Sequence, residues 1–251
     1  MKRITLYPGF DKNGIIEDFE FLTFEKGNIY SIIGDTGSGK SRLIKDIEQL
    51  VCNDSLTNRK VCVDDEIISL EDRYILSVNL VSHLSQNMRF VLDSTVEEFL
   101  IAHLECRNNT KVSVNDILKT ANTITSEPIN LKSDLTTLSG GQTRALMIAD
   151  IALVSDNPIV LIDEIENAGI NKSIALSLLL KSDKLIFIVT HDPHTALLSE
   201  KRLIMKNGAI FKVLNRTDNE IETLNKLENM YRFQLKCQEK LRKGESLYEN
   251  C

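Results

Sequence analysis

The sequence predicts an α/β fold built on a mainly parallel sheet. Short apolar runs alternate with segments of helical periodicity, as in strands joined by crossover helices. One of these runs, residues 159–162, is apolar throughout, as expected of a strand buried on both faces. With 251 residues, 42% of them hydrophobic, the chain can bury one full core. We expect one domain over residues 1–213 with a helical subdomain inserted at about 87–150, followed by a helical extension over 214–251.

The first strand-to-helix unit carries a phosphate-binding loop. An apolar run over residues 29–33 leads into GDTGSGKS, which fits G-x-x-x-x-G-K-[ST] without a mismatch and precedes an amphipathic helix starting near Lys40. Glycines let the backbone N–H groups of such a loop turn toward a phosphate at the positive end of the helix. We expect Lys40 to reach the β- and γ-phosphates of ATP and the Ser41 hydroxyl to bind Mg²⁺. The nucleotide-binding residues predicted here are Gly34, Asp35, Thr36, Gly37, Ser38, Gly39, Lys40, Ser41 and Arg42.

A second predicted strand ends in two carboxylates. The run IVLI is followed directly by Asp163 and Glu164. Because ligands bind at the carboxyl ends of parallel strands, Asp163 is placed to hold Mg²⁺, directly or through water. Glu164 is placed to polarise an attacking water. Together with the phosphate loop, this pair of carboxylates predicts an ATPase.

The motif LSGGQ, residues 138–142, indicates which kind of ATPase this is. With this motif the sequence resembles the ATP-binding cassette (ABC) family over nearly all of residues 1–213. In that family the signature of one subunit caps the γ-phosphate held by the phosphate loop of another. Two glycines and a serine that open a helix offer N–H groups, a hydroxyl and the helix dipole to an anion. The resemblance assigns this contact to Ser139, Gly140, Gly141 and Gln142.

The resemblance also implies an architecture and an assembly. The expected fold is a phosphate-loop NTPase core with a mainly parallel sheet, an N-terminal antiparallel β element and a helical signature subdomain. Because the signature of this family does not reach its own phosphate loop, the implied catalytic unit is a head-to-tail dimer around two ATP molecules. The second subunit is either a copy of this chain or a paralogue.

Two further family elements come after predicted strands. Gln86 follows a strand predicted over residues 76–81 and matches the glutamine that senses Mg²⁺ and the attacking water. His191 follows a strand predicted over residues 185–189 and matches the switch histidine that contacts the γ-phosphate. Each match is weak alone, and it is their order and spacing that support them. The catalytic residues implied are Glu164, His191, Lys40 and Gln86, and the metal-binding residues are Ser41, Gln86 and Asp163.

An aromatic side chain that stacks on adenine is expected before the phosphate loop. Phe10 and Tyr7 are the candidates, and Phe10 lies nearer the spacing usual in the family. Each residue is equally consistent with a place in the core or in a hairpin. The sequence leaves this choice open.

Local signals mark two helices of the expected subdomain. Ser94 and Glu97 form a capping-box pattern before an apolar-faced segment. Ser113 and Asp116 form a second one. We therefore expect one helix to begin after each pattern.

The end of the chain predicts a hairpin and a long helix. The dipeptide Asn207-Gly208 lies between two apolar runs, as in a hairpin turn. Residues 217–242 are charge-rich with apolar side chains at near-helical spacing, and Asp218 or Asn215 is the predicted cap. This helix either packs back on the cassette or serves as a dimerisation or partner-docking element.

One stretch departs from the family pattern. After the two carboxylates, transporter cassettes usually read Pro-Thr-Ser-Ala-Leu-Asp, whereas this chain reads Ile-Glu-Asn-Ala-Gly-Ile. The usual D-loop aspartate falls at Ile170, or at Asn171 with a one-residue slip. Asp150 stands where transporter subunits commonly have Arg. The stretch DEIEN resembles that of soluble ABC-type ATPases concerned with DNA ends and chromosome structure, and Asp150 also favours such a role. The compact segment between Gln86 and Leu138 instead resembles transporter cassettes.

Two classes of function follow. The favoured one is the ATP-binding subunit of a membrane transporter, with ATP and Mg²⁺ as cofactors and with a second ABC subunit and a membrane permease as partners. The alternative is a soluble ABC-type ATPase that remodels or activates a cytosolic protein or nucleic-acid complex.

Composition and charge predict where in the cell the protein is found and what it binds. No run approaches the roughly 20 apolar residues that cross a bilayer, and the start MKRITLY has no signal-peptide core. We therefore expect a cytoplasmic chain without membrane insertion of its own, held at the inner face of the membrane through a partner. The formal net charge of −6 argues against direct nucleic-acid binding. The five cysteines lack C-x-x-C spacing and are expected as reduced thiols.

Overall fold

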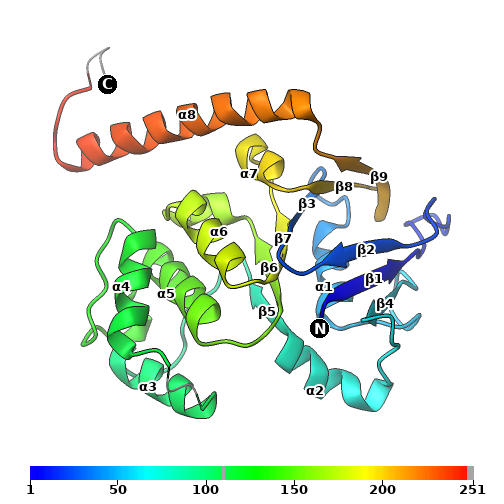
Figure 1. The fold of residues 1–251 in the computed structure, drawn as a ribbon, viewed down its shortest axis with the longest axis horizontal. Coiled ribbons are helices and arrows are strands. Elements are labelled where there is room, and N and C mark those ends of the chain that lie inside the picture. The colour runs from blue at the N-terminus through cyan, green and yellow to red at the C-terminus, as the bar shows by residue number, and fades with distance from the viewer. Residues whose placement is uncertain (109–110, 248–251) are drawn as a thin grey trace.

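The computed structural model describes residues 1–108 and 111–247. Its centre is a six-stranded sheet in the order β5-β6-β7-β3-β8-β9, beside a three-stranded antiparallel sheet in the order β2-β1-β4 (Figure 1). The larger sheet is parallel except for β9, which runs antiparallel to β8. The strands are β1 (Arg3–Tyr7), β2 (Leu22–Glu25), β3 (Ile29–Ile33), β4 (Lys60–Val63), β5 (Val81–Leu84), β6 (Ile159–Asp163), β7 (Leu185–Val189), β8 (Lys201–Lys206) and β9 (Ala209–Asn215).

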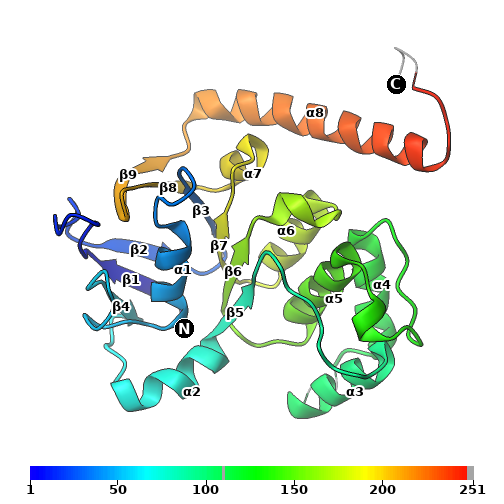
Figure 2. The same cartoon turned by 180° about the vertical axis from the view of Figure 1, so that it is seen from behind.

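Helices cover both faces of the large sheet. They are α1 (Lys40–Glu48), α2 (Leu70–Leu80), α3 (Val96–Cys106), α4 (Val114–Ile124), α5 (Gly140–Leu153), α6 (Lys172–Lys181), α7 (Pro193–Leu198) and α8 (Asp218–Arg242), with short 3₁₀ turns over Leu135–Thr137 and Ile165–Ala168. Figures 1 and 2 show α3, α4 and α5 grouped on one side of the large sheet, and α1 with the small sheet on the other. This arrangement confirms the predicted fold class, including the N-terminal antiparallel β element and the helical signature subdomain.

The strand β6 shows why the centre of the sheet reads as a continuous apolar run. Successive side chains of a strand point to opposite faces of its sheet. Ile159 and Leu161 accordingly belong to the core shared with α1 and the small sheet. Val160 and Ile162 belong to the core shared with α5 and α6. Each of these four side chains is fully buried, so neither face of the strand has room for a polar residue.

The strand predicted over residues 76–81 is wrong. Residues up to Leu80 form α2, whose N-cap Ser69 accepts a hydrogen bond from the backbone N–H of Asp72 at 3.2 Å. Leu76 and Leu80 are one helical turn apart and pack together against the main core. Apolar and polar residues alternate over residues 76–80, which is the pattern of a strand. The two leucines that pack against the core, however, are four residues apart, which is the spacing of a helix. The strand that leads to Gln86 is β5, which starts only where α2 ends.

The first predicted capping box is shifted by one residue. The N-cap of α3 is Thr95, whose hydroxyl accepts from the backbone N–H of Glu98 at 3.3 Å, while the Glu98 carboxylate accepts from the N–H of Thr95 at 2.8 Å. The pair is therefore Thr95 with Glu98 and not Ser94 with Glu97. Ser94 also fits a cap by residue type, but its hydroxyl donates to Glu98 instead. The box predicted for α4 is confirmed.

The end of the described chain consists of the predicted hairpin and a long helix. Asn207 and Gly208 join β8 to β9 with φ angles of 52° and 89°, the left-handed backbone that a tight hairpin turn requires. The helix α8 is capped by Thr217 with Glu220, rather than by Asp218 or Asn215. Asp218 is already the first helical residue, and Asn215 still belongs to β9.

Two compositional features can be compared with the structure. Within residues 1–108 and 111–247, no helix combines the length and the apolar character needed to cross a membrane. The cysteines of the described chain, Cys52, Cys62, Cys106 and Cys237, are free thiols. Cys251 lies outside the described residues.

Candidate nucleotide-binding site

The predicted site residues follow four neighbouring parallel strands. The strands β5, β6, β7 and β3 are adjacent in the sheet. Gln86, Glu164, His191 and the phosphate loop come directly after their carboxyl ends, in that order. Topology therefore gathers these motifs at one edge of the sheet, where ligands of such sheets bind.

The phosphate loop is a tight turn packed against the hairpin. Gly34, Gly37 and Gly39 have φ angles of 156°, 79° and 106°. A Cβ atom on Gly39 would lie 2.8 Å from the Cα of Gly208, closer than real Cβ contacts allow. The N–H of Gly208 donates to the carbonyl of Ser38 at 2.8 Å. Glycine is thus required in this loop for backbone conformation and for space.

The lysine of the loop is folded over it. Lys40 is buried, and its Nζ donates to the carbonyl oxygens of Gly34 and Asp35 at 2.6 and 3.0 Å. Ser41 is exposed in the first turn of α1. Arg42, also predicted as a nucleotide ligand, donates within α1 to Asp46 at 3.1 Å.

Gln86 and Glu164 are in direct contact. The Gln86 amide Nε2 donates to Glu164 Oε2 at 2.6 Å. Glu164 has a φ of 50°, a left-handed conformation that is rare outside glycine. Non-glycine residues in such conformations concentrate at functional sites, where the surrounding structure holds them. The structure thus brings together two side chains that are each predicted to act on the attacking water.

Arg144 holds both of these segments from α5. Its Nη1 donates to the carbonyl of Glu164 at 2.9 Å. Its Nη2 donates to the carbonyls of Ser85 and Gln86 at 2.7 and 3.0 Å. The side chain is only 5% exposed. Arg144 is not among the site residues predicted from the sequence, although an arginine two positions after LSGGQ, among apolar helix residues, is a usable signal.

The donor set at Asp163 fits a cation. Burial raises the pKa of the Asp163 carboxyl, and the charge of Glu164 raises it further, while Lys40 and Arg144 act in the opposite direction. The negative charge of Glu164 therefore also favours a cation at Asp163. The hydroxyl of Ser41, the amide oxygen of Gln86 and the Asp163 carboxylate are oxygen ligands of the kind that Mg²⁺ prefers.

The segment after β7, which contains Thr190 and His191, is held by a glutamate. Glu166 Oε1 accepts from the Thr190 hydroxyl at 2.9 Å and from the backbone N–H of His191 at 3.0 Å. The side chain of His191 is exposed beyond this anchor. Glu166 therefore links the segment after β6 to the segment after β7. Nothing in the sequence pattern singled out this residue.

A cluster around Tyr231 fixes α8 to the same region. The Tyr231 hydroxyl accepts from the backbone N–H of Lys172 at 3.2 Å, and Lys172 Nζ lies 4.4 Å from the ring centroid. Lys172 also pairs with Asp192, the residue after His191. His194 stacks on Tyr231 with centroids 5.3 Å apart. These contacts support the interpretation that α8 packs back on the cassette, and its role in dimerisation or docking stays a prediction.

The signature opens α5, away from the phosphate loop. Ser139 is the N-cap and accepts from the N–H of Gln142 at 3.3 Å. Its hydroxyl donates to Glu127 at 2.6 Å, a partner that the sequence did not reveal. In both views α5 stands apart from α1 across the central strands (Figures 1 and 2). A single chain therefore does not bring the predicted signature contacts to its own phosphate loop.

The sequence matches the family described as ABC transporter over residues 20–167, more than half of the chain. The chain belongs to this family. An uncharacterized ABC transporter ATP-binding protein of Methanocaldococcus jannaschii is 44% identical over 248 residues, which cover 98% of this chain and 95% of that protein. The energy-coupling factor transporter ATP-binding protein EcfA2 of Staphylococcus aureus is 28% identical over 206 residues, covering 74% of this chain and 68% of EcfA2.

Solved structures share the fold. An ATP binding subunit of an ABC transporter has a TM-score of 0.66 at 19% identity, covering 92% of this chain and 98% of that one. The ATP-binding cassette MJ0796, as a post-hydrolysis dimer bound to ADP and Pi, has a TM-score of 0.61 at 22% identity, covering 85% of this chain and 99% of that one. At these identities the likeness concerns the fold of the ABC cassette alone.

The residues that depart from the ABC sequence pattern contact other residues of the same chain. Asp150 is buried and contacts His103 Nδ1 at 2.7 Å, so it joins α5 to α3. Asn171 is the N-cap of α6 and accepts from the N–H of Ile174 at 3.2 Å. Ile170 forms a β-bridge with Thr125 and packs against the core. Both candidate D-loop positions are therefore engaged within this ABC cassette.

The two candidate aromatic residues lie in different surroundings. Phe10 is 39% exposed, in a loop whose Lys12 Nζ donates to the phosphate-loop carbonyl of Gly37 at 2.7 Å. Tyr7 lies in β1, and Lys60 Nζ covers its ring at 3.8 Å from the centroid. Only the loop of Phe10 touches the phosphate loop through these contacts. Adenine stacking on Phe10 stays a prediction for this ABC cassette.

Proposed function

We propose that this protein binds and hydrolyses ATP as the ATP-binding subunit of a membrane transporter. The observation that carries the proposal is the contact between Gln86 and Glu164 at the edge of the sheet from which the phosphate loop also starts. In this proposal the Gln86 amide orients the water that attacks the γ-phosphate, and the Glu164 carboxylate polarises it. The chain is expected in the cytoplasm, held at the inner face of the membrane by a permease.

The chemistry asks for positioning and charge rather than for covalent steps. Lys40 stabilises charge on the β- and γ-phosphates once it leaves the loop carbonyls. Glu164 polarises the attacking water, Gln86 orients that water, and His191 contacts the γ-phosphate. Ser41, Gln86 and Asp163 would hold Mg²⁺, which supplies positive charge to the transferred phosphoryl group.

The second half of each site comes from another subunit. Ser139, Gly140 and Gly141 open α5 at its N-terminus, where backbone N–H groups favour an anion, and the Ser139 hydroxyl becomes a further donor to a γ-phosphate once it leaves Glu127. Because α5 stands apart from α1 in one chain, these donors are proposed to cap ATP held by a second cassette. ATP thus closes the dimer, and hydrolysis reopens it and moves the attached permease.

Three observations bear on the choice between a transporter subunit and a soluble ATPase. The relatives named for ABC and energy-coupling factor transporters support transport. Asp150, which argued for a soluble machine, is accounted for by its contact with His103. The stretch from Ile165 to Ile170 still departs from the transporter pattern, so a soluble ATPase is kept as the second candidate.

A mixing experiment tests the composite site. Lys40→Ala removes the phosphate-loop lysine and Ser139→Arg blocks the signature, so each variant alone should be inactive. In an equimolar mixture half of the dimers carry one intact site of two, so about a quarter of the parental phosphate release should return. An inactive mixture beside an active parent would contradict assembly from two copies of this chain.

A further inference from the structure

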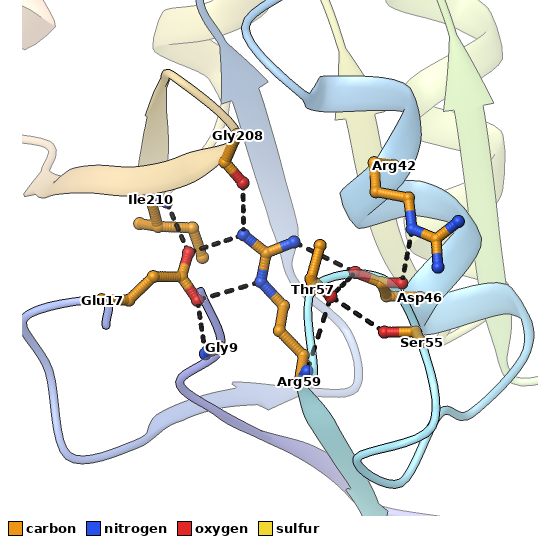
Figure 3. Close-up of polar contacts among 9 residues, drawn as sticks. All are labelled: Gly9, Glu17, Arg42, Asp46, Ser55, Thr57, Arg59, Gly208 and Ile210. Carbon is orange, nitrogen blue, oxygen red and sulfur yellow. Dashed lines mark hydrogen bonds and ion pairs between the residues drawn. The ribbon is translucent and has the colours of Figure 1, made fainter. Parts of the chain in front are cut away.

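A fully buried guanidinium lies beside the phosphate loop. Arg59 Nε and Nη2 donate to the Glu17 carboxylate at 2.9 and 2.6 Å, and Nη1 donates to Asp46 Oδ2 at 3.0 Å (Figure 3). Nη2 also donates to the carbonyl of Gly208 at 2.8 Å. The side chains of Arg59, Glu17 and Asp46 are all 0% exposed. A buried charge is tolerated only when it is paired and hydrogen-bonded, so these groups hold one another in place.

One arm of this cluster holds the loop that carries Phe10. Glu17 Oε2, which accepts from Arg59, also accepts from the N–H of Gly9 at 2.9 Å. The N–H of Phe10 donates to the carbonyl of Thr57 at 2.7 Å. A Cβ atom on Gly9 would lie 2.5 Å from Arg59 Cγ and 2.2 Å from the Thr57 carbonyl oxygen. The backbone next to Phe10 is therefore packed directly on Arg59.

The other arm reaches the phosphate loop. Asp46 lies in α1, the helix that begins at this loop. Gly208, whose carbonyl accepts from Arg59, donates its N–H to the carbonyl of Ser38 at 2.8 Å. Gly208 is also the backbone against which Gly39 packs. Arg59 thus contacts both the helix and the turn that hold the phosphate loop.

We propose that Arg59 is a positioning residue for nucleotide binding, which fixes the loop carrying Phe10 against the phosphate loop. The inference rests on the proposed function, since it takes these two segments as the places of the base and of the phosphates. Arg59 acts by holding the loop of Phe10 and the phosphate loop at a fixed distance from each other. A fixed spacing favours a ligand whose base and phosphates both fit, and it matters little to a ligand that consists of phosphates alone.

Equilibrium binding of ATP and of inorganic triphosphate, both with Mg²⁺, tests this role. Arg59→Lys keeps the charge but loses the planar fork that joins two carboxylates and a carbonyl. Glu17→Gln keeps the shape of the loop side and removes its charge. We expect each variant to bind ATP about tenfold or more weakly. Triphosphate affinity should change by less than about threefold, so that the ratio of the two affinities falls.

Arg202→Lys is the matched control. Arg202 is a nearly buried arginine that pairs with Glu220 of α8, and its substitution should leave the affinity ratio unchanged. Circular dichroism and thermal unfolding establish whether each variant is folded. If Arg59→Lys does not fold, the ratio of ATP to triphosphate affinity measured for Glu17→Gln tests the positioning role.

The outcomes separate this inference from the proposed function. Equal losses for ATP and triphosphate, parental binding of both, or failure of both variants to fold would overturn the positioning role. A parent protein that binds neither ligand would instead contradict the proposed function.

Discussion

The side-chain amide of Gln86 donates a 2.6 Å hydrogen bond to the carboxylate of Glu164. The two residues follow neighbouring strands, and Arg144 holds the backbone of both. The group proposed to orient water is therefore already aligned with the group proposed to polarise it. Their alignment depends on α5, the helix that the signature opens.

Replacing Glu164 by Gln should stop turnover. The amide keeps the size of the side chain but cannot polarise water, so phosphate release should fall by about 100-fold or more. ATP affinity should stay within about twofold, because Glu164 does not hold the nucleotide. Glu222→Gln on the exposed face of α8 is the control. Hydrolysis at the parental rate would show that the role given to Glu164 is wrong.

Arg144→Met should lower kcat more than it changes KM. The change leaves three backbone carbonyls without their donor, which costs about 1–3 kcal/mol for each buried group. It also lets the segments of Gln86 and Glu164 move, and small misplacements cost up to about 100-fold in rate. Arg216→Met removes a guanidinium that bonds the carbonyls of Leu197 and Leu198, remote from this site. Comparable kcat losses in both variants would argue against the specific role of Arg144.

Gly39→Ala should weaken ATP binding through the shape of the phosphate loop. The added Cβ meets the Cα of Gly208 at 2.8 Å, and the φ of 106° disfavours alanine. Strain of this kind costs about 1–3 kcal/mol, which corresponds to roughly 5- to 150-fold in affinity. Gly244→Ala is the matched control, because its φ is also positive and nothing lies near the added atom. Calorimetric titration with ATP should separate the two variants, and equal affinities would refute the packing argument.

Acid should loosen the start of α8. Hydrogen bonds from Arg202 and from the backbone of Thr217 lower the pKa of Glu220 from 4.5 to about 2. A carboxyl whose pKa is lower in the folded state than in the unfolded state stabilises the fold at pH values above its unfolded-state pKa. That contribution is lost as the pH falls through the folded-state pKa. Glu220→Gln should therefore expose the amides of α8 to faster hydrogen exchange at pH 7, with the difference from the parent shrinking between pH 4.5 and about 2. A difference independent of pH would contradict this assignment.

The sequence predicts best what neighbouring residues encode. The phosphate loop, the two carboxylates at the end of β6 and the hairpin at Asn207-Gly208 are local patterns, and the structure has each element where it was expected. The strand before Gln86 was misplaced because the apolar spacing of α2 also fits a strand. Whether the site residues act as assigned stays a prediction.

Contacts between distant residues were beyond prediction. Arg59 and Gly208 are 149 positions apart, and Arg144 and Gln86 are 58 apart. An isolated arginine gives no sign of which carboxylates or carbonyls the fold will bring to it. The partners of these buried arginines become known only once the sheet order is known.

Affinity purification of tagged Glu164→Gln protein from mildly solubilised native cells, held with ATP and Mg²⁺, tests the central claim most directly. The account predicts that a second ABC subunit and a protein with several membrane spans are recovered together. Recovery of soluble partners alone, or of the protein only with itself, would contradict the transporter assignment and favour a soluble ABC ATPase.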